Sequence, residues 1–217
     1  MRSAMLCCCA AEAATSDRVD VAAEDSATAE RSAAVHEAYP VLQTRPGVFN
    51  ALLVRGSVEE PIGISLESLA SSKLYIANIT GDVNSAVGRY NRDAPEHERI
   101  YPGDYIVAVD GVAHLQELKR SQLGAEIEVT VQRPLLFTVV VIKFGGCLGL
   151  EVTYDMTGST LNISTVKPST PASAPGVDLA VGDRIVAVNG RRGTATALLA
   201  ELAAAGDRKE LDVSRCA

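Results

Sequence analysis

A nine-residue block that occurs twice constrains the fold of this chain more than any other sequence feature. Gly103–Gly111 reads GDYIVAVDG and Gly182–Gly190 reads GDRIVAVNG, so the copies differ only at their third residue, Tyr105 or Arg184, and at their eighth. Gly-Asp favours a turn, Ile-Val-Ala-Val favours a short buried strand, and Asp-Gly or Asn-Gly favours a tight hairpin turn with positive φ. The repeat predicts two copies of one β-rich unit.

Matching segments surround each copy of the block. An apolar-Gly-apolar turn precedes it, PIGI at Pro61–Ile64 and CLGL at Cys147–Leu150. A helix-like stretch and a final strand follow it, Glu126–Gln132 or Glu210–Ser214. From Phe49 onward, short runs rich in Val, Ile and Leu are separated by Gly, Asp and Pro, which is typical of many short strands. We therefore expect a chain that is mostly β with short helices (α+β).

The segment before the first unit has a different composition. Residues 1–46 are rich in Ala, Ser, Glu and Asp and hold few large apolar side chains. Such a segment buries too little apolar surface to offset its conformational entropy. This predicts a disordered arm over 1–46, a first unit over 47–133 and a second unit over 134–217. Arg133 and Pro134 form so short a linker that we expect a restricted relative orientation of the units.

Charge and motif content exclude several classes of function. The chain has 20 Lys and Arg against 27 Asp and Glu, a net charge of −7, which argues against a general nucleic-acid binder. No apolar run approaches the roughly 20 residues of a membrane-spanning helix. Neither a Gly-x-Ser-x-Gly nucleophile motif nor a phosphate-binding Gly-rich loop occurs. We expect a protein that is not an enzyme and uses no cofactor.

The five cysteines are unevenly placed, with Cys7, Cys8 and Cys9 consecutive and Cys147 and Cys216 alone. This is a poor disulfide framework, and no spacing supports a metal site, so we expect a reducing, cytoplasmic compartment. Three interpretations of the consecutive cysteines stay open. The first is S-acylation, which would tether the chain to the cytoplasmic face of a membrane. The others are a weak signal peptide and no special role.

Taken in order, these features resemble the PDZ family of peptide-binding domains. The resemblance rests on the apolar-Gly-apolar turn, the x-GD-x-I-V-x-V-(N/D)-G block, a helix and a closing strand, and it covers most of 47–133 and 134–215. It implies two partly open antiparallel β-sandwiches in tandem. The implied strands are Phe49–Val54, Ile64–Leu69, Leu74–Ile79, Tyr105–Val109 and Glu126–Gln132, then Leu136–Ile142, Leu150–Tyr154, Thr160–Val166, Arg184–Val188 and Glu210–Ser214.

The resemblance also implies a binding groove in each unit. A ligand would lie antiparallel to the second strand, between that strand and the second helix, as an added strand. Its free carboxylate would be held by consecutive backbone N–H groups of the apolar-Gly-apolar turn, where glycine lets the backbone approach an anion. These donors would be Ile62, Gly63 and Ile64 in the first unit and Leu148, Gly149 and Leu150 in the second.

Other groove residues follow from the same resemblance. The second strands would contribute Leu66 and Val152, and the helices would contribute His114, Leu118, Ala195, Leu199 and Leu202. His114 matches the family's preference for Ser or Thr two residues before the ligand's end, whereas the second unit favours an apolar residue there. Arg55 and Lys143 precede the two turns and would add attraction to a carboxylate.

The hypothesis from the sequence is a non-catalytic adaptor or scaffold that binds extended C-terminal peptides of partner proteins, such as membrane or signalling proteins, by strand addition. The expected affinity is about micromolar. The alternative is a structural interaction protein whose grooves are degenerate and which acts through the interface between its two units.

Overall fold

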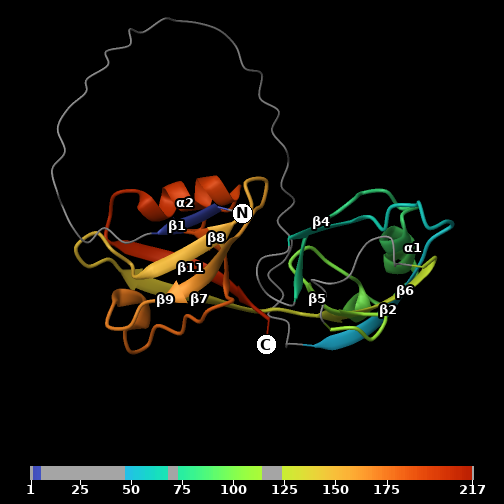
Figure 1. Ribbon diagram of the computed structural model, residues 1–217, viewed down its shortest axis with the longest axis horizontal. Helices are drawn as coiled ribbons and strands as arrows, with labels where there is room; N and C mark the ends of the chain where they lie inside the picture. Colours follow the sequence, from blue (N-terminus) through green and yellow to red (C-terminus); the bar gives the residue numbers. More distant parts are fainter. Residues whose placement is uncertain (1, 6–46, 68–72, 114–123, 217) are drawn as a thin grey trace, which may run out of the picture.

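The computed structural model describes residues 2–5, 47–67, 73–113 and 124–216, which form two antiparallel β-sheets (Figure 1). A short strand, β1 (Arg2–Met5), precedes both units. The first unit contains β2 (Val48–Val54), β3 (Ile64–Glu67), β4 (Leu74–Ile79), α1 (Ala86–Asp93), η1 (Glu96–Glu98), β5 (Tyr105–Val109) and β6 (Glu126–Gln132). The second contains β7 (Leu135–Ile142), β8 (Leu150–Tyr154), β9 (Leu161–Val166), η4 (Pro171–Ser173), β10 (Arg184–Val188), α2 (Ala195–Ala203) and β11 (Arg208–Arg215). The mostly β fold class with short helices is confirmed.

The two sheets share one strand order. It is β2-β6-β5-β4-β3 in the first unit and β7-β11-β10-β9-β8 in the second, where β1 adds a further strand beyond β8. The repeated block forms β5 in one sheet and β10 in the other. As a result, β3 and β8 lie at equivalent edges. The expected strands are present with ends shifted by at most two residues where they are described, while Ser68 and Leu69 lie outside the described residues.

The hairpin turns of the repeated block have the predicted backbone. Asp110 and Asn189 have φ of 49° and 51°, a left-handed conformation that Asp and Asn tolerate better than most residues. Each side chain then accepts a hydrogen bond from the neighbouring strand, at 2.9 Å from the Glu128 N–H and at 3.0 Å from the Glu210 N–H. The eighth residue of the block therefore fixes the turn to the last strand in both units.

Each unit also contains the same Asp-Arg ion pair with a Phe ring beside the guanidinium, which we call the Asp-Arg-Phe cluster; the Asp is buried in both units, while the Arg side chain is 9% exposed in the first and 23% exposed in the second. The cluster consists of the Asp of the Gly-Asp turn, the Arg at or directly after the end of the last strand and a Phe of the first strand. They are Asp104, Arg133 and Phe49 in the first unit, and Asp183, Arg215 and Phe137 in the second. The guanidinium carbon lies 5.0 Å from the ring centroid in the first unit and 4.8 Å in the second. Burial raises the pKa of the Asp104 carboxyl, and the Arg133 guanidinium offsets part of that rise.

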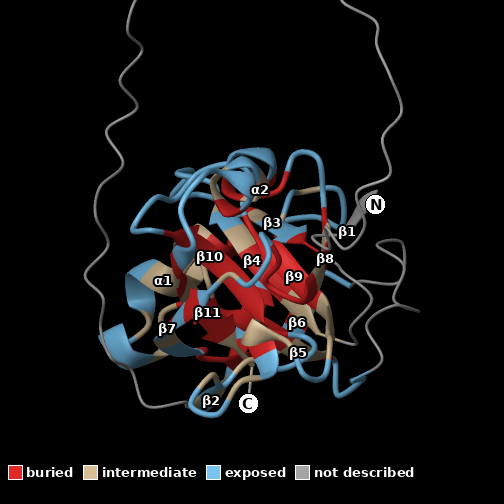
Figure 2. Ribbon diagram, turned by 90° about the vertical axis from the view of Figure 1, so that its left-hand side faces the viewer, coloured by how far each residue is buried: buried red, intermediate tan, exposed pale blue. Residues whose placement is uncertain are grey.

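Two apolar clusters form the cores, one for each unit. Buried residues concentrate on the strands, while the outer surface of α2 is exposed (Figure 2). Helix α2 contributes the buried Leu198 and Leu202 to its core, whereas the buried residues of α1 are the smaller Ala86 and Val87. Thr194 is the N-cap of α2, because its hydroxyl accepts a hydrogen bond from the backbone of the first turn.

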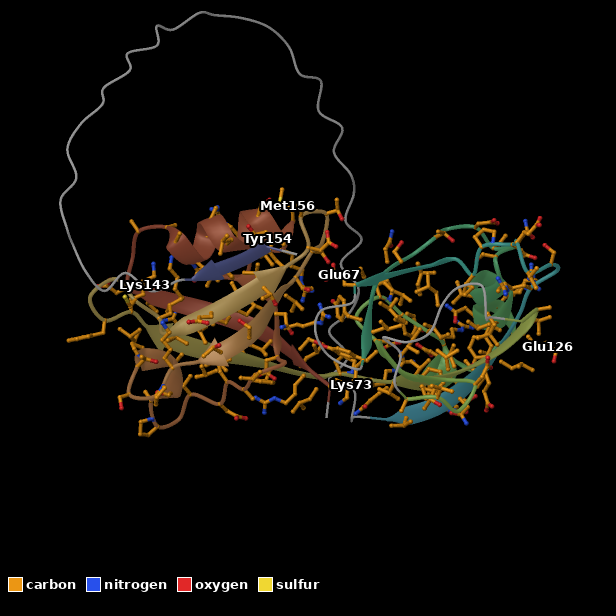
Figure 3. All side chains as sticks on the ribbon, viewed as in Figure 1. Glu67, Lys73, Glu126, Lys143, Tyr154 and Met156 are labelled. Atoms are coloured by element: carbon orange, nitrogen blue, oxygen red, sulfur yellow. The ribbon has the colours of Figure 1, made fainter. Side chains whose placement is uncertain are left out.

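A buried polar contact joins the two units. Glu67 of β3 forms an ion pair of 3.2 Å with Arg184 of β10, and both side chains are at most 6% exposed. The Arg184 guanidinium lies 4.7 Å from the ring centroid of Tyr75, and the Glu67 carboxylate also accepts a 2.7 Å hydrogen bond from Thr160. In Figure 3, Glu67 lies between the two units. These contacts, together with the short linker, hold the units in one relative orientation.

One of the two positions at which the blocks differ, the third, builds this interface. Tyr105 and Arg184 occupy the same position in β5 and β10, and both are buried. The Tyr105 hydroxyl lies 3.1 Å from the Ser214 hydroxyl of the second unit. The interface thus uses the third position of each block, while the shared positions serve the cores.

The predicted disordered arm over 1–46 is wrong for Arg2–Met5. These residues form β1 and pair with every residue of β8 except Leu150, the first residue of that strand. The physical reason is that an edge strand presents unpaired N–H and C=O groups, which a segment of any composition is able to satisfy. Residues 6–46, including Cys7, Cys8 and Cys9, lie outside the described residues, so their predicted disorder and acylation stay predictions.

Candidate functional site

The two apolar-Gly-apolar turns have the same close packing. Gly63 and Gly149 have φ of 91° and 83°, which side chains rarely adopt. A Cβ at Gly63 would collide with the hydroxyl of Ser85, and one at Gly149 would collide with the hydroxyl of Thr170. Ser85 and Thr170 are the N-cap residues of α1 and η4. Glycine is therefore required at both turns for backbone conformation and for contact with the following helix.

In the first turn, backbone hydrogen bonds fix the direction of two consecutive carbonyl groups. The Ile62 carbonyl accepts a 3.0 Å hydrogen bond from the Val87 N–H, and the Gly63 carbonyl accepts one of 2.9 Å from the Thr80 N–H. A carbonyl and the N–H that follows it point in opposite directions across a trans peptide, and none of the peptide bonds described is cis. The N–H groups of Gly63 and Ile64 therefore point away from these partners, as an anion site requires.

The second turn repeats this arrangement. The Leu148 carbonyl accepts a 3.0 Å hydrogen bond from the Ala172 N–H, and the Gly149 carbonyl accepts one of 2.9 Å from the Lys167 N–H. By the same geometry, the N–H groups of Gly149 and Leu150 point away from Ala172 and Lys167. The Pro-rich segment that forms η4 thus supports the turn in the way that α1 does in the first unit.

The orientation of the β3 backbone follows from its partner in β4. Leu66 is the cross-strand partner of Ile76. The Ile76 N–H donates to the Asp104 carbonyl and its carbonyl accepts from the Gly103 N–H, so both groups face β5. In an antiparallel pair of this kind, the opposite residue turns its own N–H and C=O away as well. The main-chain groups of Leu66 therefore face the outer edge of the sheet, where no other described strand pairs with β3.

The same reasoning applies to β8. Val152 is the partner of Ile163, whose N–H donates to the Asp183 carbonyl and whose carbonyl accepts from the Gly182 N–H. The main-chain groups of Val152 therefore face the outer edge. Leu66 and Val152, both predicted as groove residues, hold equivalent backbone positions in the two units.

The outer edge of β8 is already paired. Strand β1 runs antiparallel to it, with Arg2 opposite Tyr154, Ala4 opposite Val152 and Met5 opposite Glu151. Figure 1 shows β1 on the side of β8 that faces α2. This is the place that the resemblance assigns to a ligand, and β1 also runs toward the apolar-Gly-apolar turn. Sequence reasoning missed this strand because no local pattern in the arm indicates a partner so far along the chain.

The apolar side chains of the second groove are mostly buried. Leu148, Leu150, Val152, Ala195 and Leu202 belong to the core cluster, and Leu199 packs against it as a partly buried residue. In the first unit Ile62 and Ile64 pack partly buried against the core, while Leu66 is 43% exposed. His114 and Leu118 lie outside the described residues, so the helical wall of the first groove stays a prediction.

The first edge is bordered by the second unit. A cavity of about 380 Å³ lies beside β3. It is lined by Ser65, Leu66, Glu67, Ala77 and Asn78 of the first unit and by Asp155, Thr157, Gly158 and Ser159 of the second. Anything bound along this part of β3 would therefore meet residues of both units.

Arg55 and Lys143 have structural roles that the sequence did not indicate. The Arg55 guanidinium is buried and donates to the carbonyls of Gly124 and Val58, which gives it a structural role, and its predicted attraction for a carboxylate stays a prediction. A buried cation needs such acceptors to offset its lost hydration. The Lys143 ammonium donates a 3.0 Å hydrogen bond to the Ala204 carbonyl at the C-terminal end of α2, which complements the helix dipole. Its predicted attraction for a ligand carboxylate stays a prediction.

Among the described residues, none of the helices is long and apolar enough to cross a membrane. No group of three or more His, Cys, Asp or Glu side chains in these segments is arranged to hold a metal ion.

Comparison with known proteins gives distant structural neighbours. No model of a known protein family matches the chain, and no curated protein matches it. A structure described as a complex of INAD PDZ45 and NORPA CC-PBM is similar at 16% identity, covering 79% of this chain and 91% of that chain, with a TM-score of 0.35. A structure of INAD PDZ45 in complex with an NG2 peptide is similar at 18% identity, covering 81% and 91%, with a TM-score of 0.32. The fold of this chain is defined by its strand order, its strand pairing and the repeated block. It does not depend on these distant similarities.

Proposed function

We propose that this chain is a PDZ-like, non-catalytic scaffold that binds extended peptide segments of partner proteins by β-strand addition at the edges of β3 and β8. The observation that carries the proposal is the pairing of β1 with β8, because it places an added strand where a ligand is expected. Main-chain hydrogen bonds along such an edge give affinity, and neighbouring side chains give selectivity.

The turns support a ligand that ends in a carboxylate. The outward N–H groups of Gly63 and Ile64, and of Gly149 and Leu150, would receive its oxygens. Two or three charge-assisted bonds at about 1.5–3 kcal/mol each and one buried aliphatic side chain at about 1.5–3 kcal/mol favour binding. Association and strand ordering cost several kcal/mol. We therefore propose a Kd of about micromolar, suited to reversible capture.

The alternative, action through the interface between the units, has weaker support. Glu67 and Arg184 satisfy each other and are nearly inaccessible within the chain. An interface buried between two units of one chain does not offer those residues to a partner. We infer that it sets the spacing of the two edges. Cytoplasmic location and membrane tethering through Cys7–Cys9 stay predictions from the sequence.

The proposal is tested with a library of decapeptides that carry free C-terminal carboxylates, each paired with its amidated twin. Binding to the full chain is measured by fluorescence polarisation. We expect a subset of peptides to bind at about micromolar Kd and to lose most of that affinity on amidation.

The matched variants are Leu66→Pro and Leu66→Val. Proline removes the outward N–H of β3 at a position where an edge strand tolerates it, whereas valine keeps the donor. Binding at β3 should be lost only with proline. A library from which no peptide binds the parent chain would contradict the proposed function.

A further inference from the structure

We propose that Arg2–Met5 is an internal ligand of the second unit, so that partner peptides reach β8 only by displacing it, while the edge of β3 accepts them without this competitor. This inference rests on the proposed function, since it names what regulates one of the two edges. It assigns different tasks to two edges that have the same backbone geometry.

The hydrogen-bonding pattern explains how so short a segment is held. The main-chain groups of Val152 face outward, so its partner Ala4 occupies a hydrogen-bonded position. Main-chain direction alternates along a strand, so Ser3 turns its own N–H away from β8. The attachment of β1 therefore depends on the backbone of Ala4 and not on that of Ser3.

The direction of β1 makes it a competitor of a peptide ligand rather than an unrelated edge strand. Its chain runs from the Tyr154 end of β8 toward Glu151, beside the turn. A bound peptide whose carboxylate sits in the turn would run the same way, so both need the outward groups of Val152. Because the chain continues beyond Met5, β1 brings no carboxylate, and its last register pair is with Glu151 rather than Leu150.

Chain connectivity allows this pairing within one molecule. Residues 6–47 connect β1 to β2, and a segment of that length spans up to about 140 Å when extended. A tethered ligand of this kind is present at about millimolar effective concentration. If the segment alone has a Kd near 0.1 mM, the apparent Kd of a competing peptide at β8 rises about tenfold.

The test uses a fluorescein-labelled peptide, Arg-Ser-Ala-Met-Leu, which is amidated so that it copies the internal segment. Its binding is measured on four full-length proteins: the parent chain, Ala4→Pro, Ser3→Pro, and Ala4→Pro combined with Leu66→Pro. Both β1 variants leave the sequence of the two units unchanged. Proline at Ala4 removes the donor to β8, while proline at Ser3 removes an N–H that faces away.

We expect Ala4→Pro to bind the probe about tenfold more tightly than the parent chain, and Ser3→Pro to behave like the parent chain. The gain should persist when Leu66→Pro is added, because the vacated edge is β8. A gain that disappears in the combined variant would place the probe on β3 and would overturn the inference.

The remaining outcomes separate this inference from the proposed function. Equal binding of the probe by the parent chain and Ala4→Pro would show that β8 is not self-occupied, and the inference fails while strand addition stands. If the probe binds none of the four proteins but carboxylate-terminated library peptides bind, the inference also fails alone. If neither the probe nor any library peptide binds, both fail.

Discussion

The two units share a fold but use their equivalent edges differently. Both contain the Asp-Arg-Phe cluster, the glycine turn packed on an N-cap and the block strand in the middle of the sheet. In the first, the edge at β3 is unpaired among the described residues; in the second, the edge at β8 carries β1. Two units with the same fold are therefore able to differ in function, because the pairing of each edge strand depends on segments outside the unit.

The units also differ at the third position of the block, and this difference joins them. Tyr105 and Arg184 project from equivalent strands toward the other unit. Arg184 gives Glu67 the cation that a buried carboxylate requires, while Tyr105 contributes a neutral hydroxyl. Divergence at one position lets the two units face each other without an unpaired charge.

The largest expected effect is therefore at Arg184. Arg184→Ala leaves the Glu67 carboxylate buried without its cation, which should reduce the free energy of unfolding by about 3–5 kcal/mol. The measurement is chemical denaturation followed by circular dichroism. The control is Arg191→Ala, whose 77% exposed side chain pairs with Glu201 at the surface and should change stability by about 0–1 kcal/mol. Equal, small losses in both variants would refute the buried contact.

The next largest effect sharpens the comparison of the helices. Leu198→Ala removes a buried side chain of α2 and should cost about 2–5 kcal/mol through lost transfer energy and a cavity. Leu199→Ala, at the partly buried neighbour, should cost clearly less. The two variants are compared by thermal and chemical unfolding. A larger loss at Leu199 would mean that the face of α2 packed on the core has been assigned to the wrong residues.

Alkaline pH offers a third test of the interface. Burial raises the pKa of Tyr75 to about 12 from an ordinary value of 10. Because the folded pKa exceeds the unfolded one, this contribution to stability is complete below pH 10 and is lost as the pH rises toward 12. The loss should be on the order of 2–3 kcal/mol. Unfolding curves at several pH values should show a larger loss of stability at alkaline pH in the parent chain than in Tyr75→Phe. Equal losses in the two proteins would contradict this prediction.

The smallest expected effect concerns the other half of the interface. Tyr105→Phe removes the hydroxyl that contacts Ser214 and should cost about 1 kcal/mol. Comparing this loss of stability with the loss in Arg184→Ala shows how unequally Tyr105 and Arg184 stabilise the interface. The same denaturation experiment serves, with Tyr154→Phe in the second unit as the comparison. A loss as large as that of Arg184→Ala would remove the asymmetry between the two positions.

Local pattern was sufficient to predict the strands and the turns. Alternating apolar residues, Gly-Asp and Asn-Gly are short-range signals, so their consequences were visible in the sequence. The glycine turns were also placed correctly, although the collision partners Ser85 and Thr170 required the structure. The Ser85 hydroxyl caps α1 and Thr170 is the N-cap residue of η4, and the sequence did not place either element next to its turn.

Contacts between distant residues were not predictable from these patterns. The pairing of Ala4 with Val152 and of Glu67 with Arg184 depends on tertiary arrangement. One signal was present for the second contact, since the blocks differ at Arg184 in an otherwise apolar run. Arg55 was assigned to a ligand because its position before the turn was known, while its carbonyl partners were not.

The claim that the outer edge of β8 accepts an added strand is tested most directly by amide hydrogen exchange, resolved by residue, on the full chain and on Ala4→Pro. We expect the Val152 amide to exchange at least tenfold faster in Ala4→Pro than in the parent chain, Ser3→Pro to leave it unchanged, and the Leu66 amide to be equally fast in all three. A Val152 amide that exchanges at one rate in all three proteins would contradict strand addition at this edge.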